Sequence, residues 1–259
     1  MIEMFAKAYK RGFWSSLVWL FWKIKFAVFS ALGVKNVTSK YQVKLTANYS
    51  DITFRYYFFG SYGYYFSGLL QSQTKEFSFI DVGANQGLYS IIAAKNPRCK
   101  RVLSFEPIDV TYDLLTKNIA INSVGEKCRA FKKAIDNVAE TKSITFDSSH
   151  TGVTTLAGDH VESKNMKTIE TVDCNCLNDF FSDLNEDVYL KVDVEGYEQT
   201  VLNELFKAEK SSLICGVFYE VDVQWVDPAE LEALLRSHGF THFEKIGVSD
   251  AHYDIFATK

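Results

Sequence analysis

The sequence lacks a strong excess of charge of either sign. It carries 28 Lys and Arg against 32 Asp and Glu, a net charge of −4, and its pI is near 5.8. Without a basic field to attract a polyanion, nucleic acid is excluded as the main partner. Internal repeats and low-complexity tracts are also missing from the sequence. Its 259 residues, 47% of them hydrophobic, suffice for one substantial core with an appendage.

Cysteine is scarce and odd in number. Five cysteines occur in a chain long enough to be stable without cross-links. The pair in "DCNC" is accompanied by no second cysteine or histidine pair at zinc-ligand spacing, so we assign no residue to a metal site. We expect reduced thiols and a cytoplasmic protein. The cysteines are Cys99, Cys128, Cys174, Cys176 and Cys215.

The sequence also lacks an uncharged apolar run long enough to cross a bilayer. Residues 13–33 are dense in aromatics, but Lys23 and Lys25 interrupt them before the ~18 to 20 residues that a span needs. The small-residue cleavage site of a secretory signal does not follow. A helix with apolar side chains on nearly every side must be shielded from water by protein or by a membrane surface. We expect residues 1–34 to pack against the domain or a second copy in a homo-oligomer, or to make peripheral membrane contact.

Residues 36–76 are rich in Tyr and Phe. Their first part has the composition of β-strands, and glycines interrupt the later part. Their tyrosines could line a pocket for a ring-shaped polar substrate, because Tyr offers a flat apolar face and a hydroxyl, or they could be ordinary packing. We divide the chain into an N-terminal extension, 1–76, and a domain, 77–259.

From residue 77 onward, short apolar runs alternate with helical patterns, which is typical of βα units and a parallel sheet. The last 19 residues resemble an antiparallel hairpin at a sheet edge. The sequence therefore predicts an α/β fold with a doubly wound, mostly parallel sheet. The predicted strands are 77–82, 101–106, 128–135, 187–194 and 212–221, and the predicted helices are 87–95, 109–122, 195–209 and 228–238.

The first of these strands ends in a distinctive turn, "FIDVGANQG". A strand that ends at Asp81 and is followed by Gly83, Gly87 and a helix is where an open α/β sheet binds a nucleotide-like ligand. The dinucleotide fingerprint would also need glycine at positions 85 and 88, which hold Asn85 and Leu88. Asp81 would repel a phosphate but would suit a ligand that carries positive charge.

The second strand ends in "LSFEP", which places Glu106 at its carboxyl end. A carboxylate in this position can accept hydrogen bonds from both hydroxyls of a ribose. A ribose without phosphates and with a cationic tail describes S-adenosylmethionine, which is the predicted cofactor.

An ordered set of motifs resembles the FkbM family of S-adenosylmethionine-dependent methyltransferases. The matching segments are "FIDVGANQGLYS", "LSFEPIDVTYDLLTKNIAIN", "FKKAIDN", "TVDCNCLNDFF" and "VYLKVDVEGYEQTVLNEL". The resemblance covers about residues 77 to 221. It implies a seven-stranded, Rossmann-like methyltransferase fold and methyl transfer to a hydroxyl oxygen, with sugars and polyketides among the acceptors. One departure is Cys174, where the family commonly has a second aspartate.

The resemblance and the local chemistry together assign the cofactor site. Asp81 and Asn85 would hold the methionine end, Gly83 and Gly87 would let the backbone approach, and Glu106 would bind the ribose. The set also includes three neighbouring residues of these motifs: Ala84, Pro107 and Ala134, the last facing the adenine.

The acceptor side needs a base close to the reacting hydroxyl. "KVDVEGYE" places Asp193 and Glu195 at the carboxyl end of a central strand, and Asp193 is the leading candidate. Glu195 could instead cap the following helix. Lys191 points to the same side of a buried strand as Asp193 and needs an acidic partner, which could be Asp193 itself. Glu220 ends the next strand and could border the same cleft.

Two further possibilities remain from the sequence. His150 lies in a long irregular stretch and could be the base, contact the acceptor or be solvated. Acidic residues at strand ends could bind Mg²⁺. The predicted reaction is O-methylation of a small molecule or glycan, with an α/β oxidoreductase or a catalytically silent, membrane-associated binding protein as alternatives.

Overall fold

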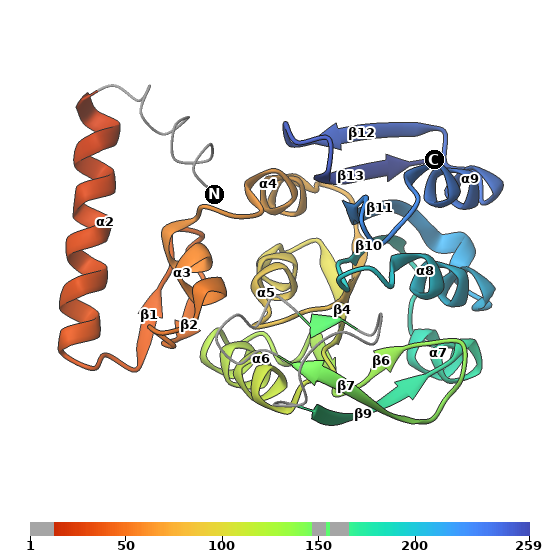
Figure 1. The fold of residues 1–259 in the computed structure, drawn as a ribbon, viewed down its shortest axis with the longest axis horizontal. Helices are drawn as coiled ribbons and strands as arrows, with labels where there is room; N and C mark the ends of the chain where they lie inside the picture. Colours follow the sequence, from red (N-terminus) through yellow and green to blue (C-terminus); the bar gives the residue numbers. More distant parts are fainter. Residues whose placement is uncertain (1–12, 147–153, 156–165) are drawn as a thin grey trace.

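The protein is described by a computed structural model that covers residues 13–146, 154–155 and 166–259. Its centre is a seven-stranded sheet flanked by helices (Figure 1). In spatial order the strands are β12 (His242–Ile246), β13 (His252–Thr258), β11 (Ile214–Asp222), β10 (Asp187–Val192), β3 (Phe77–Val82), β4 (Cys99–Phe105) and β5 (Cys128–Phe131). The five strands from β11 to β5 run parallel to one another. Strand β13 runs antiparallel to β11, and β12 runs antiparallel to β13. This confirms the predicted fold class and the C-terminal hairpin.

Both faces of the sheet are covered, as the pattern of β3 requires. Ile80 and Val82 face a core that contains α7 (Cys174–Phe181), α8 (Glu198–Lys207) and α9 (Pro228–Ser237). Phe77 and Phe79 face a second core with α5 (Leu88–Lys95) and α6 (Asp109–Ile121). Successive side chains of a strand point to opposite faces, so a strand that is buried throughout is apolar throughout.

The N-terminal extension contributes to the second core. It contains α2 (Phe13–Ala31), the hairpin β1 (Asn36–Thr38) and β2 (Lys44–Thr46), α3 (Ile52–Phe59) and α4 (Tyr64–Ser72). Phe66 of α4 stacks on Phe218 of β11, with ring centroids 4.4 Å apart. The amide of Asn118 in α6 accepts from the backbone N–H of Thr46 at 2.7 Å. Residues on the two sides of position 76 therefore share one core. The division of the chain into an extension, 1–76, and a domain, 77–259, stays a prediction.

A small second sheet precedes α7. Its order is β6 (Ala134–Ile135), β9 (Met166–Val172), β7 (Thr141–Phe146) and β8 (Thr154–Thr155). The prediction of one strand over 128–135 is wrong, because the chain leaves the main sheet after Phe131. Phe131 pairs with Phe105, the last residue of β4, so a longer strand would have no neighbour there. Ala134 and Ile135 pair with β9 instead.

The remaining elements agree closely with the sequence. Three predicted helices match α5, α6 and α9 to within one residue at each end. The helix predicted from residue 195 begins at Glu198, because Glu195 and Gly196 have φ of 55° and 98°. A short 3₁₀ helix (Ser211–Leu213) leads into β11. Within the part of the chain that the structure describes, none of the helices has the length and apolarity to span a bilayer.

Candidate active site

The site lies where the strand order reverses. The chain proceeds from β3 to β4 and β5 on one side and later adds β10 and β11 on the other. Loops at the carboxyl ends of β3 and β10 therefore diverge, and open α/β sheets bind ligands at such a point. The turn after β3 and the loop after β10 lie against each other there: a Cβ on Gly83 would lie 2.0 Å from the carbonyl oxygen of Asp193.

The turn after β3 needs left-handed backbone at three positions. Gly83, Asn85 and Gly87 have φ of 73°, 49° and 84°. Glycine meets this requirement without strain, and Asn tolerates it better than most residues. The N–H groups of Gly83 and Ala84 both donate to the carbonyl of Phe105 at 3.0 Å, which ties the turn to the end of β4.

Asp81 anchors this turn through buried contacts to Ser90 and Lys191. Its side chain is fully buried, and its Oδ2 accepts from the backbone N–H of Ser90 at 3.1 Å and from its hydroxyl at 2.5 Å. Its Oδ1 lies 3.8 Å from Nζ of Lys191. Burial raises the pKa of Asp81, and the Lys191 charge opposes that rise. Because Asp81 has no exposed surface, its contact with the methionine end of a cofactor stays a prediction.

Glu106 lies beside the turn, at the end of β4. Its carboxylate accepts from the backbone N–H of Asn85 at 2.9 Å and of Ile108 at 3.0 Å, one on each oxygen. Burial raises the pKa of Glu106 to about 7, against the lowering effect of these two bonds. A carboxylate oxygen has two lone pairs, so each oxygen keeps one for a ligand. Ala134 packs with Ile108 and Ile169 nearby, which supplies an apolar surface.

Lys191 joins the turn to the loop after β10. Its buried Nζ donates to the carbonyl of Gly83 at 2.7 Å and lies 3.1 Å from Oδ2 of Asp193. Asp193 is therefore the acidic partner that the strand pattern required, with Asp81 as a second. Burial of an ammonium is costly unless it is paired and hydrogen-bonded, and both conditions hold here.

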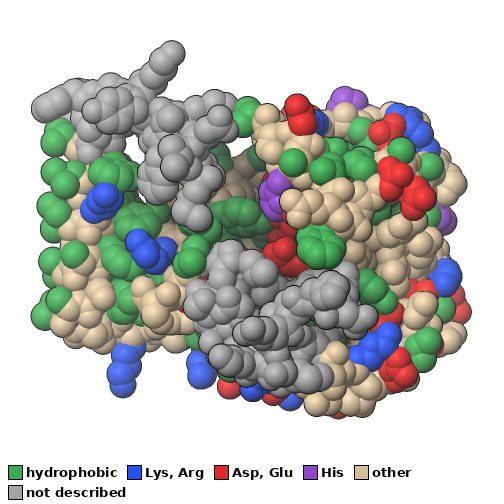
Figure 2. Space-filling view, viewed as in Figure 1, with side chains coloured by type: hydrophobic (Ala, Val, Ile, Leu, Met, Phe, Trp, Pro, Cys, Tyr) green, Lys and Arg blue, Asp and Glu red, His purple; other side chains and the backbone are tan. Residues whose placement is uncertain are grey.

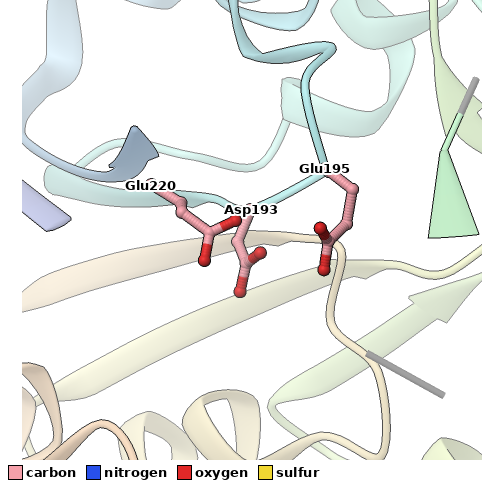
Figure 3. Close-up of side chains that lie close together, drawn as sticks. All are labelled: Asp193, Glu195 and Glu220. Atoms are coloured by element: carbon pink, nitrogen blue, oxygen red, sulfur yellow. The ribbon is translucent and has the colours of Figure 1, made fainter. Parts of the chain in front are cut away.

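Three carboxylates gather beyond Lys191. Asp193, Glu195 and Glu220 each place a ligand atom within 4.8 Å of those of the other two, with Asp193 between its neighbours (Figure 3). Tyr62, from the N-terminal extension, donates its hydroxyl to Oδ2 of Asp193 at 3.1 Å. In Figure 2, acidic side chains lie at the edge of a hollow between the N-terminal layer and the sheet. Of the residues that the structure describes, this cluster is the group that could hold a divalent cation.

Burial and mutual repulsion raise the pKa of two members of this cluster, Glu195 and Glu220. Burial, with the charges of Glu220 and Asp193, raises the pKa of Glu195 to about 8. Burial and the charge of Asp193 also raise the pKa of Glu220. The acid in the first turn of α8 is Glu198 rather than Glu195, and its carboxylate accepts from the N–H of Val194 at 3.0 Å and of Gly196 at 3.1 Å in the loop before the helix.

The antiparallel strand β13 contributes two residues that the sequence did not reveal. Because β13 is antiparallel, its beginning lies beside the carboxyl end of β11, and Asp254 pairs in register with Glu220. Nε2 of His252 lies 2.9 Å from Oε1 of Glu220, and this bond raises the pKa of His252 to about 9. Burial and the charge of Asp193 raise the pKa of Asp254 to about 7. The predicted hairpin could have indicated these residues, because a strand antiparallel to β11 begins beside the carboxyl end of β11.

The sequence analysis also singled out His150, Cys174 and Pro107. His150 lies outside the described residues. Cys174 is a free thiol in the first turn of α7, a helix that Asp173 caps by accepting from the backbone N–H of Cys176 at 3.1 Å. Pro107 follows Glu106 directly, so it shares the position of that carboxylate at the end of β4.

Comparisons with known proteins agree with this geometry. A family model described as the methyltransferase FkbM domain matches residues 81–241, more than half of the chain. Methyltransferase sdnD of Sordaria araneosa is 28% identical over 189 residues, which cover 62% of this chain and 72% of that protein. Methyltransferase 1 of Beauveria bassiana is 27% identical over 179 residues, covering 62% and 71%.

A solved structure shows the same fold. The crystal structure of methyltransferase FkbM from Methylobacillus flagellatus is 16% identical, and the match covers 76% of this chain and 46% of that one with a TM-score of 0.51. The family match, the two related methyltransferases and the turn between β3 and α5 lead to one conclusion: the chain belongs to the FkbM family and is a methyltransferase.

Proposed function

We propose that this methyltransferase transfers a methyl group from S-adenosylmethionine to a hydroxyl oxygen of a small molecule or glycan, with a sugar as the favoured acceptor. One observation carries the proposal. A buried carboxylate with spare acceptor capacity, Glu106, flanks the β3 turn, and a cluster of carboxylates suited to deprotonating a hydroxyl begins one strand away, at Asp193. The chain thus offers a ribose acceptor and a base at the ends of the two strands that flank β3.

The residues after β3 and β4 fit this cofactor. Glu106 would accept from the ribose hydroxyls, and the apolar surface around Ala134 would face the adenine. Asn85 and the backbone of Gly83 to Gly87 would lie along the methionine portion. When bound, the cofactor supplies an electrophilic methyl carbon. The residues of the chain supply its orientation and the removal of the acceptor proton.

Asp193 is the proposed proton acceptor. Lys191 and Tyr62 both contact its Oδ2, and a cation together with a hydroxyl donor stabilises an ionised carboxylate. With the cofactor bound, Asp193 would take the proton of the acceptor hydroxyl whose oxygen receives the methyl group. Neighbouring carboxylates whose environments differ can divide acid and base roles in this way.

Glu195 and Glu220 are proposed to orient the acceptor. The pKa of about 8 favours a protonated carboxyl group at Glu195, which can donate a hydrogen bond, whereas Glu220, paired with His252, can accept one. A sugar presents several hydroxyls, and a cluster with both donor and acceptor groups can bind two of them at once. The tyrosines of the extension, with Tyr62 at the site, fit the earlier expectation of a surface for a polar ring.

We also propose a cytoplasmic location for the enzyme. The five cysteines are free thiols, two of them, Cys99 and Cys128, being buried. An odd number of unpaired thiols is typical of proteins in a reducing compartment.

The test is a methylation assay with methyl-labelled S-adenosylmethionine and a panel of sugars and glycolipid head groups. We expect label in a C–O–CH₃ group, detected by NMR, and loss of that label when the acceptor is replaced by its deoxy analogue. Label on nitrogen or carbon would overturn O-methyl transfer. An absorbance change with a nicotinamide cofactor instead would favour the oxidoreductase alternative.

A further inference from the structure

The N-terminal segment has a charge opposite to that of the whole protein. Between Glu3 and Asp51 the sequence contains eight basic residues and no acidic one, although the full chain carries −4. The basic residues are Lys7, Lys10, Arg11, Lys23, Lys25, Lys35, Lys40 and Lys44. This asymmetry makes the segment attractive to an anionic surface while the rest of the chain is repelled by it.

The helix α2 in this segment has two apolar faces. One face contacts α3, where Trp22 and Phe26 pack against Phe58 with ring centroids 5.2 and 5.4 Å apart. The second face is formed by four residues at the spacing i, i+4, i+7 and i+11, which places them on one side of a helix. These residues, named here the outer stripe, are Leu17, Phe21, Ile24 and Val28, and they are 42%, 60%, 55% and 45% exposed.

Two lysines lie on opposite sides of α2, between the outer stripe and the face that contacts α3, and each lies over a tryptophan ring. Nζ of Lys23 lies 3.7 Å from the ring centroid of Trp19, and Nζ of Lys25 lies 4.3 Å from that of Trp22. Figure 2 shows hydrophobic side chains along the outer edge of the molecule at α2, with basic side chains beside them. Trp and Lys suit the boundary between a bilayer and water, because each has an apolar body and a polar end.

We propose that the outer stripe of α2 docks on the surface of an anionic lipid bilayer. Its apolar side chains would enter the boundary between head groups and acyl chains, and the lysines would lie among the lipid phosphates and carboxylates. The helix lies in the plane of the surface, which requires neither the length nor the uniform apolarity of a spanning helix.

The charge of the segment decides between a bilayer and a second copy of the chain. Two copies that met through this face would bring together two segments that each carry eight basic residues and no acid. Like charges opposed across an interface are unfavourable, whereas an anionic bilayer supplies the complementary charge. The proposal concerns α2 alone and stands whichever acceptor the active site methylates.

Flotation of the full-length protein with vesicles tests this inference. We expect the protein to float with vesicles of phosphatidylcholine and phosphatidylserine and to remain behind with phosphatidylcholine alone. Because screening weakens the attraction of exposed charges, about 0.5 M salt should reduce the floated fraction several-fold. The double substitution Phe21→Glu and Ile24→Glu should lower binding about tenfold or more, since it removes apolar area and adds charge repelled by the lipid.

The chain offers a matched control for the apolar face. Val28→Glu and Val248→Glu place the same charge at exposed valines, one in the outer stripe and one in the hairpin between β12 and β13. Only Val28→Glu should reduce flotation, with unchanged melting temperatures in both variants. The proposal is overturned if the wild-type protein does not float, or if both variants float alike. It is also overturned if the protein sediments as a dimer that Val28→Glu dissociates, because the face then joins two copies.

Discussion

The turn after β3 and the carboxylate cluster after β10 lie side by side at one edge of the sheet, yet they are assembled differently. In the turn, the partners are close in sequence: Asp81 bonds to Ser90, and Glu106 bonds to Asn85 and Ile108. In the cluster, the hydroxyl that reaches Asp193 comes from Tyr62, 131 residues away. Glu220 comes from β11, and the neighbouring His252 and Asp254 come from β13. The turn is a local structure, and the cluster exists only once the whole chain is folded.

The turn after β3 lies within the part of the chain that matches the FkbM family, whereas Tyr62 at the carboxylate cluster does not. The family model that matches the chain begins at Asp81, so Tyr62 and the rest of the extension lie outside it. A cofactor common to many enzymes can be bound by a short local motif, whereas the proposed acceptor site is built from segments that only the folded chain brings together. Lys191 is where the two halves meet, because it contacts Gly83, Asp81 and Asp193.

We call the carboxylate cluster after β10 the acceptor half of the proposed site and the turn after β3 with Glu106 its cofactor half. Asp193→Asn should have the largest effect of the substitutions, and it should affect only the acceptor half. If Asp193 takes the hydroxyl proton, turnover should fall ~10² to 10⁴-fold, the usual scale for a general base, while cofactor affinity stays nearly unchanged. Single-turnover kinetics and calorimetric titration of S-adenosylmethionine measure the two quantities. Asp187→Asn, an exposed position at the opposite end of β10, is the control.

A different result would assign Asp193 to structure. Lys191 would lose its nearer carboxylate in the variant, and breaking a buried ion pair can cost ~3 to 5 kcal/mol of stability. Asp81 at 3.8 Å limits that loss, so we expect the variant to fold. A collapsed melting transition would show that pairing with Lys191 is the main role, and wild-type turnover would exclude both roles.

Gly83→Ala should damage both halves at once. The new methyl group would lie 2.0 Å from the carbonyl oxygen of Asp193, and the residue has φ of 73°. We expect a loss of stability of ~1 to 3 kcal/mol with weaker cofactor binding and slower turnover together. Gly239→Ala has the same backbone strain, at φ of 87°, but meets no atom of the described residues within 4 Å. Equal loss of stability in the two variants would mean that the contact between turn and loop is unimportant.

Glu106→Ala should act on the cofactor half alone. It removes the proposed ribose acceptor and should weaken binding of S-adenosylmethionine by ~1.5 to 3 kcal/mol, the range for hydrogen bonds to a charged group. Glu106→Gln keeps one oxygen acceptor and should lose less. Calorimetry on both variants checks this, and an unchanged affinity in Glu106→Ala would contradict the assignment. Because Glu106 also accepts from two backbone N–H groups, melting temperatures must be compared in parallel.

The same contrast explains which features could be predicted from the sequence. The turn, the position of Glu106 and the presence of a mostly parallel sheet follow from short-range patterns, so the sequence was sufficient to predict them. Strand 128–135 was misassigned because its end depends on the length of β4, its neighbour in space. Asp254 was missed because its position depends on the register of β13 against β11. Tyr62 could not be singled out, since nothing local distinguishes it from the packing aromatics around it.

Tyr62→Phe tests whether the N-terminal extension contributes to catalysis. Loss of its hydroxyl removes one of two donors to Oδ2 of Asp193, and Lys191 remains. We expect kcat/KM for the acceptor to fall by about fivefold, corresponding to ~1 kcal/mol for one hydrogen bond, with cofactor affinity unchanged. Tyr65→Phe removes a similar bond to Glu244 on the surface and should leave kinetics unaltered. Equal effects of the two changes would show that the hydroxyl of Tyr62 acts only in packing.

The smallest effect is the pH dependence of stability, which should originate mainly in the acceptor half. Folding raises the pKa of Glu195 from 4.5 to about 8 and that of Asp254 from 3.8 to about 7. Between these values the folded state binds more protons than the unfolded state, so stability falls as pH rises. His252, whose pKa rises from 6.5 to about 9, contributes in the same direction because its favourable charge is lost over that range.

The melting temperature should therefore be higher at about pH 5.5 than at about pH 8.5. Glu195→Gln cannot ionise and should reduce that difference, whereas Glu126→Gln, at an exposed position far along the chain, should not. Glu106 lies in the cofactor half with a pKa of about 7 and adds to the same slope. Saturating S-adenosylmethionine should thus change the Glu106 contribution while leaving that of Glu195 in place. A slope that vanishes in Glu106→Gln and persists in Glu195→Gln would place the proton-binding centre in the turn instead of the carboxylate cluster.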